Sequence, residues 1–250
     1  MRATAESIPA PDTEMLTLRT GSMGSRYIAF YADSGTVLAL ARLHLEDVFR
    51  RVVLDPVRGL VLLMTPGRTH EGLSSRVDFV VQEAATLLSL DCEPLRATRW
   101  RRPTDPPDTG AEPDCCYYLG ENALTYQTFD EDEGELADAW ALAHPPDLVV
   151  EVEVTHFDRA KQIFYRDLGV PEYWHLEQMP DRTLSAVFLD LRAPGSPTPL
   201  TESRLLPGLT PAALSASVRA MKKCAFRNRR DMLLTVLREH GMAVVSSAPG

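Results

Sequence analysis

Features that mark several common protein classes are scarce or missing in this sequence. The four cysteines form no CxxC pair, which counts against a zinc site or a disulfide framework and favours buried, reduced thiols. No apolar run approaches the roughly 18 residues needed to span a bilayer. The first 15 residues are polar and lack the apolar core of a secretory signal, so we expect a loose N-terminal tail, a cytoplasmic protein and no membrane partner.

Positive charge is also in short supply, and it is unevenly placed. The formal net charge of −9 counts against a simple nucleic-acid-binding module, but less against a nuclease whose acids gather at a metal and in one loop. Residues 129–138 hold six acids and no base, so we expect a solvated loop there. Residues 204–239 hold eight Lys or Arg against two acids, which is typical of either a DNA-contacting arm or a solvated helix face.

The periodicity of apolar residues predicts an α/β fold. In chain order we expect a helix over 70–90, strands over 94–100, 114–119 and 147–154, a helix over 158–168, and strands over 172–177 and 183–191. The third of these strands begins as a nearly continuous apolar run, which is typical of a central strand buried on both faces. This order fits a central mixed β-sheet flanked by helices, and neither an all-helical nor an all-β fold.

The flanking segments carry fewer signals. We expect a short helix over 44–51, a buried strand over 59–64 with a turn at 65–67, loop over 101–111, a long acidic connection over 120–145, and a helix over 211–238 that Asn228 interrupts. The chain then divides into a partly loose N-terminal extension (1–40), a main domain (41–200), a basic helical segment packed on that domain (201–240) and a tail (241–250).

Carboxylates on the predicted central strand are the strongest sign of chemistry. Glu151 and Glu153 lie two residues apart and therefore on the same face of that strand. Buried charges need compensation, and a divalent cation binds carboxylate and carbonyl oxygens, for which the Val152 carbonyl is a further candidate. Asp114 opens another predicted strand, and Lys161 falls in the first turn of the next helix if Asp158 is its N-cap. Two acids, a cation and a nearby ammonium are the parts that phosphodiester hydrolysis needs.

The same segments resemble a known family. The stretch 145–177 combines a PDLVVEV strand, an Asp-led helix with Lys-x-x-x-Tyr spacing and a closing GVPEYW, and it resembles the Uma-type restriction endonucleases, a branch of the PD-(D/E)xK nuclease superfamily. Upstream, GAEPDCCYYL (110–119) is similar to the family's EPD strand, and LLMTPGRTHEGLSSRV (62–77) is similar to the entry into its first core helix. The resemblance covers roughly residues 45–192.

This resemblance implies a restriction-endonuclease-like core with the order α-β-β-β-α-β, and a Mg²⁺- or Mn²⁺-dependent nuclease whose partner is DNA. It implies Asp114 as the first metal acid and Glu151 as the second, to which the Val152 carbonyl noted above adds a further candidate ligand. The parent motif has its lysine at the position of Glu153, and here Lys161 on the helix takes that place. Asp114, Glu151, Lys161 and Glu153 are therefore the candidate catalytic residues, and a homodimer would suit an enzyme that cuts two strands.

Neighbouring residues have simpler interpretations. Asp147 follows a proline at a strand start, which favours a turn or cap role over metal ligation. His70 and Glu71 either reach the site or complement a helix N-terminus, and the second role is expected. For Glu153, a salt-bridged acid and a metal ligand are equally good readings. Three aromatic residues are expected to pack in the core: Tyr165, Tyr173 and Trp174.

Three functions remain open at this point. The leading hypothesis is a metal-dependent endonuclease acting on DNA. The second is a non-catalytic descendant that keeps the fold and binds a protein or a nucleic acid, which the acidic net charge favours. The third is a metal-dependent hydrolase of a small phosphorylated substrate, for which a deep closed pocket would be the evidence. The sequence has no Walker-type phosphate loop, GxSxG or HExxH motif, so those enzyme classes lack support.

Overall fold

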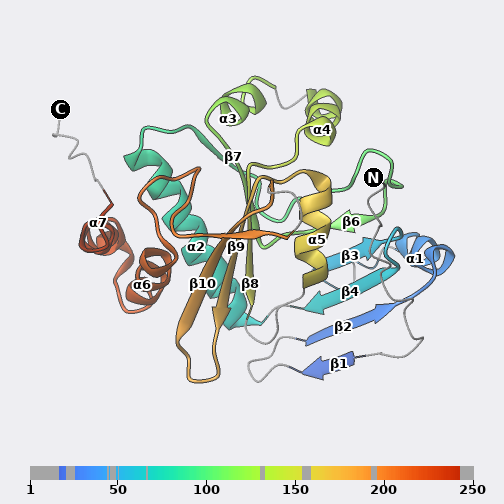
Figure 1. Cartoon of the computed structure of the whole chain (residues 1–250), viewed down its shortest axis with the longest axis horizontal. Coiled ribbons are helices and arrows are strands. Elements are labelled where there is room, and N and C mark those ends of the chain that lie inside the picture. The colour runs from blue at the N-terminus through green and yellow to red at the C-terminus, as the bar shows by residue number, and fades with distance from the viewer. Residues whose placement is uncertain are drawn as a thin grey trace, which may run out of the picture.

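The computed structural model describes residues 17–20, 26–43, 45, 49, 51–65, 67–129, 133–153, 159–192 and 196–242. Strands in these ranges form two sheets (Figure 1). The N-terminal sheet contains, in spatial order, β1 (Thr17–Thr20), β2 (Arg26–Tyr31), β4 (Leu60–Thr65), β3 (Arg51–Asp55) and β6 (Gly110–Ala111). The central sheet contains, in spatial order, β11 (Thr198–Leu200), β10 (Leu184–Asp190), β9 (Glu172–Gln178), β8 (Leu148–Glu153), β7 (Cys115–Leu119) and β5 (Cys92–Pro94).

Helices flank these sheets, which confirms the predicted α/β class. In chain order they are α1 (Ser34–Ala41), α2 (Arg68–Leu87), α3 (Glu121–Tyr126), α4 (Gly134–Ala143), α5 (Arg159–Leu168), α6 (Pro211–Met221), the 3-10 turn η3 (Phe226–Asn228) and α7 (Arg229–Glu239). Within the described ranges, none of these helices has the length and apolar content needed to cross a membrane.

The central sheet is mixed, as predicted. β8 and β9 run parallel, because α5 carries the chain back between them, whereas β7 pairs with β8 and β10 pairs with β9 in the antiparallel sense. β8 is buried along almost its whole length, which confirms it as a central strand covered on both faces. Gly169 ends α5 with a φ of 100°, a left-handed conformation that favours glycine at a helix end.

Two apolar layers cover the faces of the central sheet. One layer joins β8 and β9 to α2, α6 and α7 through residues such as Val150 and Trp174. The other joins the opposite face to α5 and to the N-terminal sheet through residues such as Val149, Phe164 and Leu62. Figure 1 shows α2, α6 and α7 on one side of the central sheet, and α5 with the N-terminal sheet on the other. Glu151 points into the second layer, so the candidate site lies between two sheets and α5.

The N-terminal sheet adds structure that the hydrophobic pattern did not predict. Arg51 was expected to end a short helix, but it begins β3 and pairs across to Met64 of β4. The rest of that predicted helix, except residues 45 and 49, lies outside the described residues, as does Pro66 of the predicted turn. β2 and α1 also occupy part of the expected N-terminal extension, and β2 pairs with β4.

The strand predicted over 94–100 is wrong. β5 already ends at Pro94, and Arg96 has a φ of 54°, which an extended strand does not allow. The Thr98 amide then donates to the Leu95 carbonyl in a turn, and Trp100 meets Ala111 in an isolated bridge. The alternation of apolar residues here reflects a coil packed on the core, not a strand.

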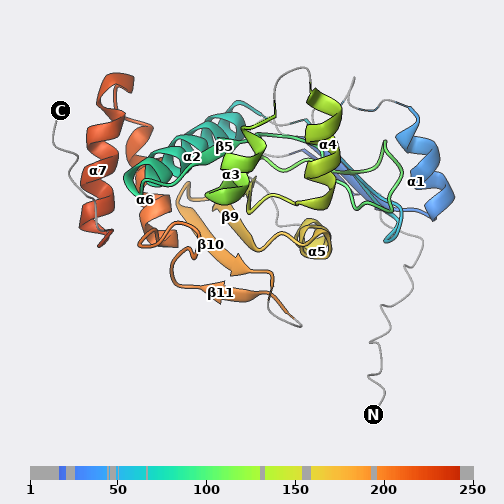
Figure 2. The same ribbon diagram turned by 90° about the horizontal axis from the view of Figure 1, so that it is seen from above.

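The acidic connection is largely helical where the structure describes it, so the expectation of a loop is wrong there, whereas its described acids Glu135 and Asp138 are exposed to solvent as expected. α3 and α4 fall within 120–145, and their aromatic residues pack together: the ring of Trp140 lies 5.0 Å from that of Tyr118. Residues 130–132 of the acidic run lie outside the described residues. Figure 2 shows α3 and α4 next to one another, seen from above. The predicted C-terminal helix is interrupted as expected, between α6 and α7.

Candidate functional site

Asp114 lies one residue ahead of β7 and is only 4% exposed. Its Oδ2 accepts hydrogen bonds from the backbone N–H of Val152, at 2.7 Å, and interacts with Nε2 of His70, at 3.1 Å. Its Oδ1 lies 3.3 Å from Nε of Arg51. Burial alone would raise the pKa of Asp114, but the positive charges of His70, Lys161 and Arg51 hold that pKa well below its ordinary value. Asp114 is therefore a buried carboxylate that stays ionised.

Glu151 is the second buried acid, and the sheet register places it beside Asp114. Cys115 pairs with Val150, so one further step along the two antiparallel strands brings the two acids side by side. Glu151 is 1% exposed, and burial together with the Asp114 charge raises its pKa to about 7, against the opposing effect of Lys161. This carboxyl group therefore gains or loses its proton near neutral pH.

Lys161 and Tyr165 from α5 both contact Glu151. The Lys161 ammonium lies 2.8 Å from Oε2, and the Tyr165 hydroxyl donates to Oε1 at 3.1 Å. The two residues are four positions apart, so they share one face of α5. Burial lowers the pKa of Lys161, but the Glu151 and Asp114 charges outweigh it and leave that pKa raised. The predicted strand, strand and helix thus bring Asp114, Glu151 and Lys161 together, while the proposed N-cap Asp158 lies outside the described residues.

Three of these contacts were missed or misjudged from the sequence. His70 was expected to complement the start of a helix, but it reaches Asp114 and is 2% exposed. Glu71 remains in the first turn, 3.7 Å from Nδ1 of His70. Arg51 was assigned to a helix, although the apolar run that follows it was a signal for a buried strand. Tyr165 is buried as predicted, and its hydrogen bond to Glu151 gives it a second role.

The remaining candidates lie outside this contact network. The Glu153 carboxylate is partly buried and lies 3.6 Å from Nε2 of His175 on the neighbouring strand β9. Asp147 accepts hydrogen bonds from the Leu119 N–H and the Asn122 amide, both at 2.8 Å, so it ties a strand end as expected. Two aromatic residues are fully buried core residues, as predicted: Tyr173 and Trp174.

The donor set fits a hard divalent cation. Two carboxylates from neighbouring strands face the same layer, and Oδ1 of Asp114 is buried without a hydrogen bond although it has the Arg51 charge nearby. Within the described ranges no cluster of three or more His, Cys, Asp or Glu side chains is arranged to hold a metal. A Mg²⁺ ion held by two carboxylates keeps several waters, so a larger protein cage is not required.

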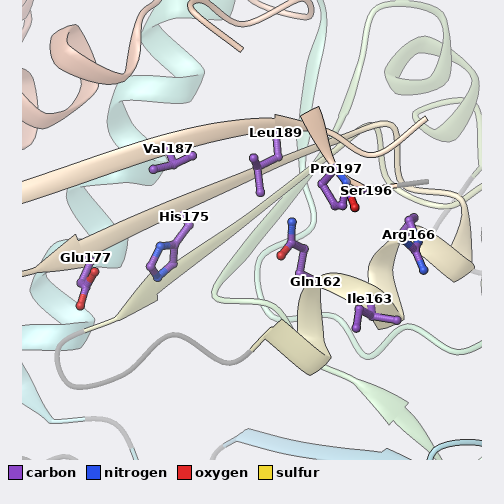
Figure 3. Close-up of a pocket in the computed structure, with 9 residues that line it drawn as sticks. All are labelled: Gln162, Ile163, Arg166, His175, Glu177, Val187, Leu189, Ser196 and Pro197. Atoms are coloured by element: carbon purple, nitrogen blue, oxygen red, sulfur yellow. The ribbon is translucent and has the colours of Figure 1, made fainter. Parts of the chain in front are cut away.

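A pocket of about 580 Å³ opens beside this site, between α5, β9 and β10. Figure 3 shows Gln162 on α5 and His175 on β9 at facing sides of it. Gln162 follows Lys161 in the chain, and His175 pairs with Glu151 in the sheet register, so the pocket adjoins the Glu151 and Lys161 side of the site. Arg166 and Glu177 line it as well, which gives it both charges.

The mixed central sheet, with acids on two adjacent strands and a lysine on the crossover helix, defines a restriction-endonuclease-like protein. The sequence comparison agrees with this class: residues 44–216 match the model of the Uma2 family, whose description is "Putative restriction endonuclease". The match covers more than half of the chain, which therefore belongs to the Uma2 family. A search of curated proteins found no match.

Proposed function

We propose that this protein is a Mg²⁺- or Mn²⁺-dependent endonuclease that hydrolyses phosphodiester bonds of DNA at Asp114, Glu151 and Lys161. One observation carries the proposal: the Lys161 ammonium lies 2.8 Å from a buried glutamate whose neighbour across the sheet is a second buried acid. Strongly perturbed charges of this kind gather at functional sites. Membership of the Uma2 family supports the same reaction class.

The protein groups divide the work. Asp114 and Glu151, with the Val152 carbonyl, would hold the cation, which when bound polarises the phosphate and lowers the pKa of a water. Lys161 remains protonated and offsets the negative charge that develops on the phosphate oxygens. The Tyr165 hydroxyl fixes the rotamer of Glu151 through its hydrogen bond. The Glu153 charge raises the pKa of Lys161 and so helps to keep the ammonium protonated.

Two cationic side chains have positioning roles in this scheme. His70 and Arg51 hold the carboxylate of Asp114 from two different elements, α2 and β3. Because both contacts come from outside the central sheet, they fix the carboxylate relative to the N-terminal sheet and to the first turn of α2. The Val152 N–H adds a third contact to the same carboxylate, from β8.

The test is cleavage of DNA by three purified proteins: wild type, Asp114→Asn and Glu151→Gln, each with Mg²⁺ or with EDTA. We expect metal-dependent cleavage by the wild type and a loss on the order of 100-fold or more in both variants. Glu177→Gln is the matched control, because Glu177 lines the neighbouring pocket on β9 without contacting either acid, and it should cleave like the wild type. Cleavage by both acid variants at the wild-type rate would show that the site assignment is wrong.

A second function has its own observation. Both acids are buried and already paired with protein cations, Asp114 with Arg51 and Glu151 with Lys161, as in a closed ion-pair network. A catalytically inactive nuclease-fold protein that binds a protein or a nucleic acid would have this arrangement. Calorimetric titration with Mn²⁺ separates the two functions, because only the endonuclease requires binding that Asp114→Asn weakens.

A further inference from the structure

A groove outside the acid pair gathers positive charge. It has a volume of about 260 Å³ and lies between α2, α6 and the turn that joins β9 to β10. Five cationic side chains line it: Arg68, Arg76, Arg182, Arg219 and Lys222. None of its lining residues is an Asp or a Glu. This is a concentration of one sign in a protein whose net charge is −9.

These five cations have no counter-charge within the described ranges. None of their side chains forms an ion pair or a hydrogen bond with another described residue. Other arginines of the protein are paired with acids, for example Arg51 with Asp114, Arg99 with Glu112 and Arg230 with Glu83. Like charges that are close together repel one another, so an anion that enters the groove stabilises the folded protein.

Arg76 shows this need most clearly. Its Nε is buried and has no hydrogen-bond acceptor within the described part of the chain. Burial and the neighbouring Arg229 charge lower the pKa of Arg76, so its surroundings offer no compensation for the guanidinium. Thr69, Gly72 and Arg76 recur at helical spacing and form one face of α2 toward the groove. A partly buried guanidinium whose Nε has no acceptor is a ready partner for a phosphate oxygen.

The groove and the acid pair meet at the first turn of α2. Arg68 and Thr69 line the groove, and the next residue, His70, contacts Asp114 at 3.1 Å. Figure 1 shows the start of α2 near the end of β8 and close to the β9–β10 turn. A polyanion held at the acid pair can therefore continue into the groove without crossing the molecule.

We infer that this basic groove binds the phosphodiester backbone of the DNA strand that flanks the scissile bond. The inference rests on the proposed function for the identity of the ligand. The groove itself contributes affinity and orientation, because phosphate contacts fix the register of a nucleic acid and carry no sequence information. It also gives an acidic protein a local surface on which a polyanion is attracted.

The test compares two triple variants of equal charge. The groove variant is Arg68→Gln, Arg182→Gln and Arg219→Gln, and the control is Arg42→Gln, Arg227→Gln and Arg238→Gln. All six arginines are exposed, and no ion pair holds any of them within the described ranges, so folding should persist in both. Binding of a fluorescent duplex is measured by anisotropy in EDTA at several salt concentrations, which separates binding from cleavage.

We expect the groove variant to bind the duplex on the order of tenfold more weakly than the wild type. The slope of log affinity against log salt concentration should become shallower by about 0.9 for each phosphate contact removed. The control variant should bind like the wild type. Equal losses in the two variants, or no loss in the groove variant, would overturn the inference. Inorganic phosphate is included as a competitor, and displacement of the duplex by phosphate as efficient as by unlabelled DNA would also overturn it.

A small chromogenic phosphodiester, bis(4-nitrophenyl) phosphate, separates this inference from the proposed function. This ester has a single phosphodiester group and no flanking backbone phosphates, so the groove variant should hydrolyse it at the wild-type rate while Glu151→Gln does not. If the wild type hydrolyses neither this ester nor DNA, yet the groove variant alone loses DNA binding, the groove stands and the proposed function fails. If hydrolysis is intact and the groove variant binds normally, the groove fails.

Discussion

Glu151 and Asp114 are neighbours across two strands, but their carboxyl groups differ in how readily they hold a proton. Asp114 receives two hydrogen-bond contacts and an arginine charge, and its pKa lies below the ordinary value. Glu151 has Lys161 as its cation, yet burial and the Asp114 charge raise its pKa to about 7. Each acid therefore contributes differently to the dependence of stability and metal binding on pH.

Asp114→Asn should destabilise the protein at pH 7 by about 3 kcal/mol, because it leaves the buried Arg51 and His70 without their anionic partner. The folded-state pKa of Asp114 is lowered, so its contribution is present above the unfolded value of 3.8 and is lost as the pH falls toward the folded value. The difference in the free energy of unfolding between the variant and the wild type should thus become smaller as the pH is lowered from 4 to 3. Urea unfolding at pH 7, 4 and 3 measures it.

The matched control for that experiment is Asp138→Asn on α4, where the carboxylate is exposed. It should change the free energy of unfolding by less than about 0.5 kcal/mol. An Asp114→Asn protein as stable as the wild type at pH 7 would mean that the buried contacts of Asp114 contribute little.

Metal binding should depend on pH through Glu151, because a metal ligand must be deprotonated. Its pKa of about 7 predicts that Mn²⁺ affinity rises by about tenfold per pH unit below pH 7 and levels off above it. Lys161→Met removes the charge that lowers this pKa, so the plateau should move to higher pH. Calorimetry between about pH 5.5 and 8.5 checks both statements, and a Mn²⁺ affinity that does not vary with pH would contradict them.

Sequence reasoning found the acids and the lysine of the site because they lie within motifs of fixed spacing. It could not find Arg51, because that residue reaches Asp114 from a different sheet, and no local pattern encodes a contact between residues 63 positions apart. It misjudged His70 for the same reason. Tyr165 was placed in the core correctly, but a core tyrosine and one that donates a hydrogen bond to a buried acid have the same sequence signal.

The elements were predicted best where a full face is buried. α2, β8, α5, β9 and β10 each have a clear periodicity, and the structure confirms them within a few residues. The strand over 94–100 failed because apolar alternation does not reveal the left-handed backbone at Arg96. The helices of the acidic connection were not predicted, because the many acids suggested a solvated loop. An aromatic cluster around Trp140 gives these helices a packed face.

The turn between β3 and β4 offers a test at this level. Gly59 has a φ of 67°, and a Cβ built there would lie 2.1 Å from the Ala32 carbonyl oxygen. Gly59→Ala should therefore destabilise the protein by about 2 kcal/mol or more, because the backbone of the sheet that carries Arg51 must shift. Thermal or urea unfolding measures the change.

Gly134→Ala is the control for the same substitution. Gly134 begins α4, and a Cβ there meets nothing within 4 Å. Alanine should be neutral or stabilise the helix by up to about 1 kcal/mol. Equal effects of the two substitutions would show that the close approach of Gly59 to Ala32 does not matter.

The charge distribution of the whole molecule reconciles an acidic protein with a polyanionic substrate. The acids and the basic groove meet at the first turn of α2, so in the proposed scheme the DNA backbone would be attracted and the bond hydrolysed on adjoining surfaces. The net charge of −9 therefore argues only against binding over the whole surface. The family match and the site geometry remain consistent with a nuclease.

Nicking of supercoiled plasmid by the wild type and by Lys161→Met, with Mg²⁺ or EDTA, tests the central claim most directly. Lysine and methionine have similar lengths, so the substitution removes the charge next to Glu151 with little change of shape, and a melting curve verifies that the variant folds. Our account predicts nicking that requires Mg²⁺ and that falls on the order of 100-fold or more in Lys161→Met. Nicking by the folded variant at the wild-type rate, or nicking by the wild type that EDTA does not stop, would contradict it.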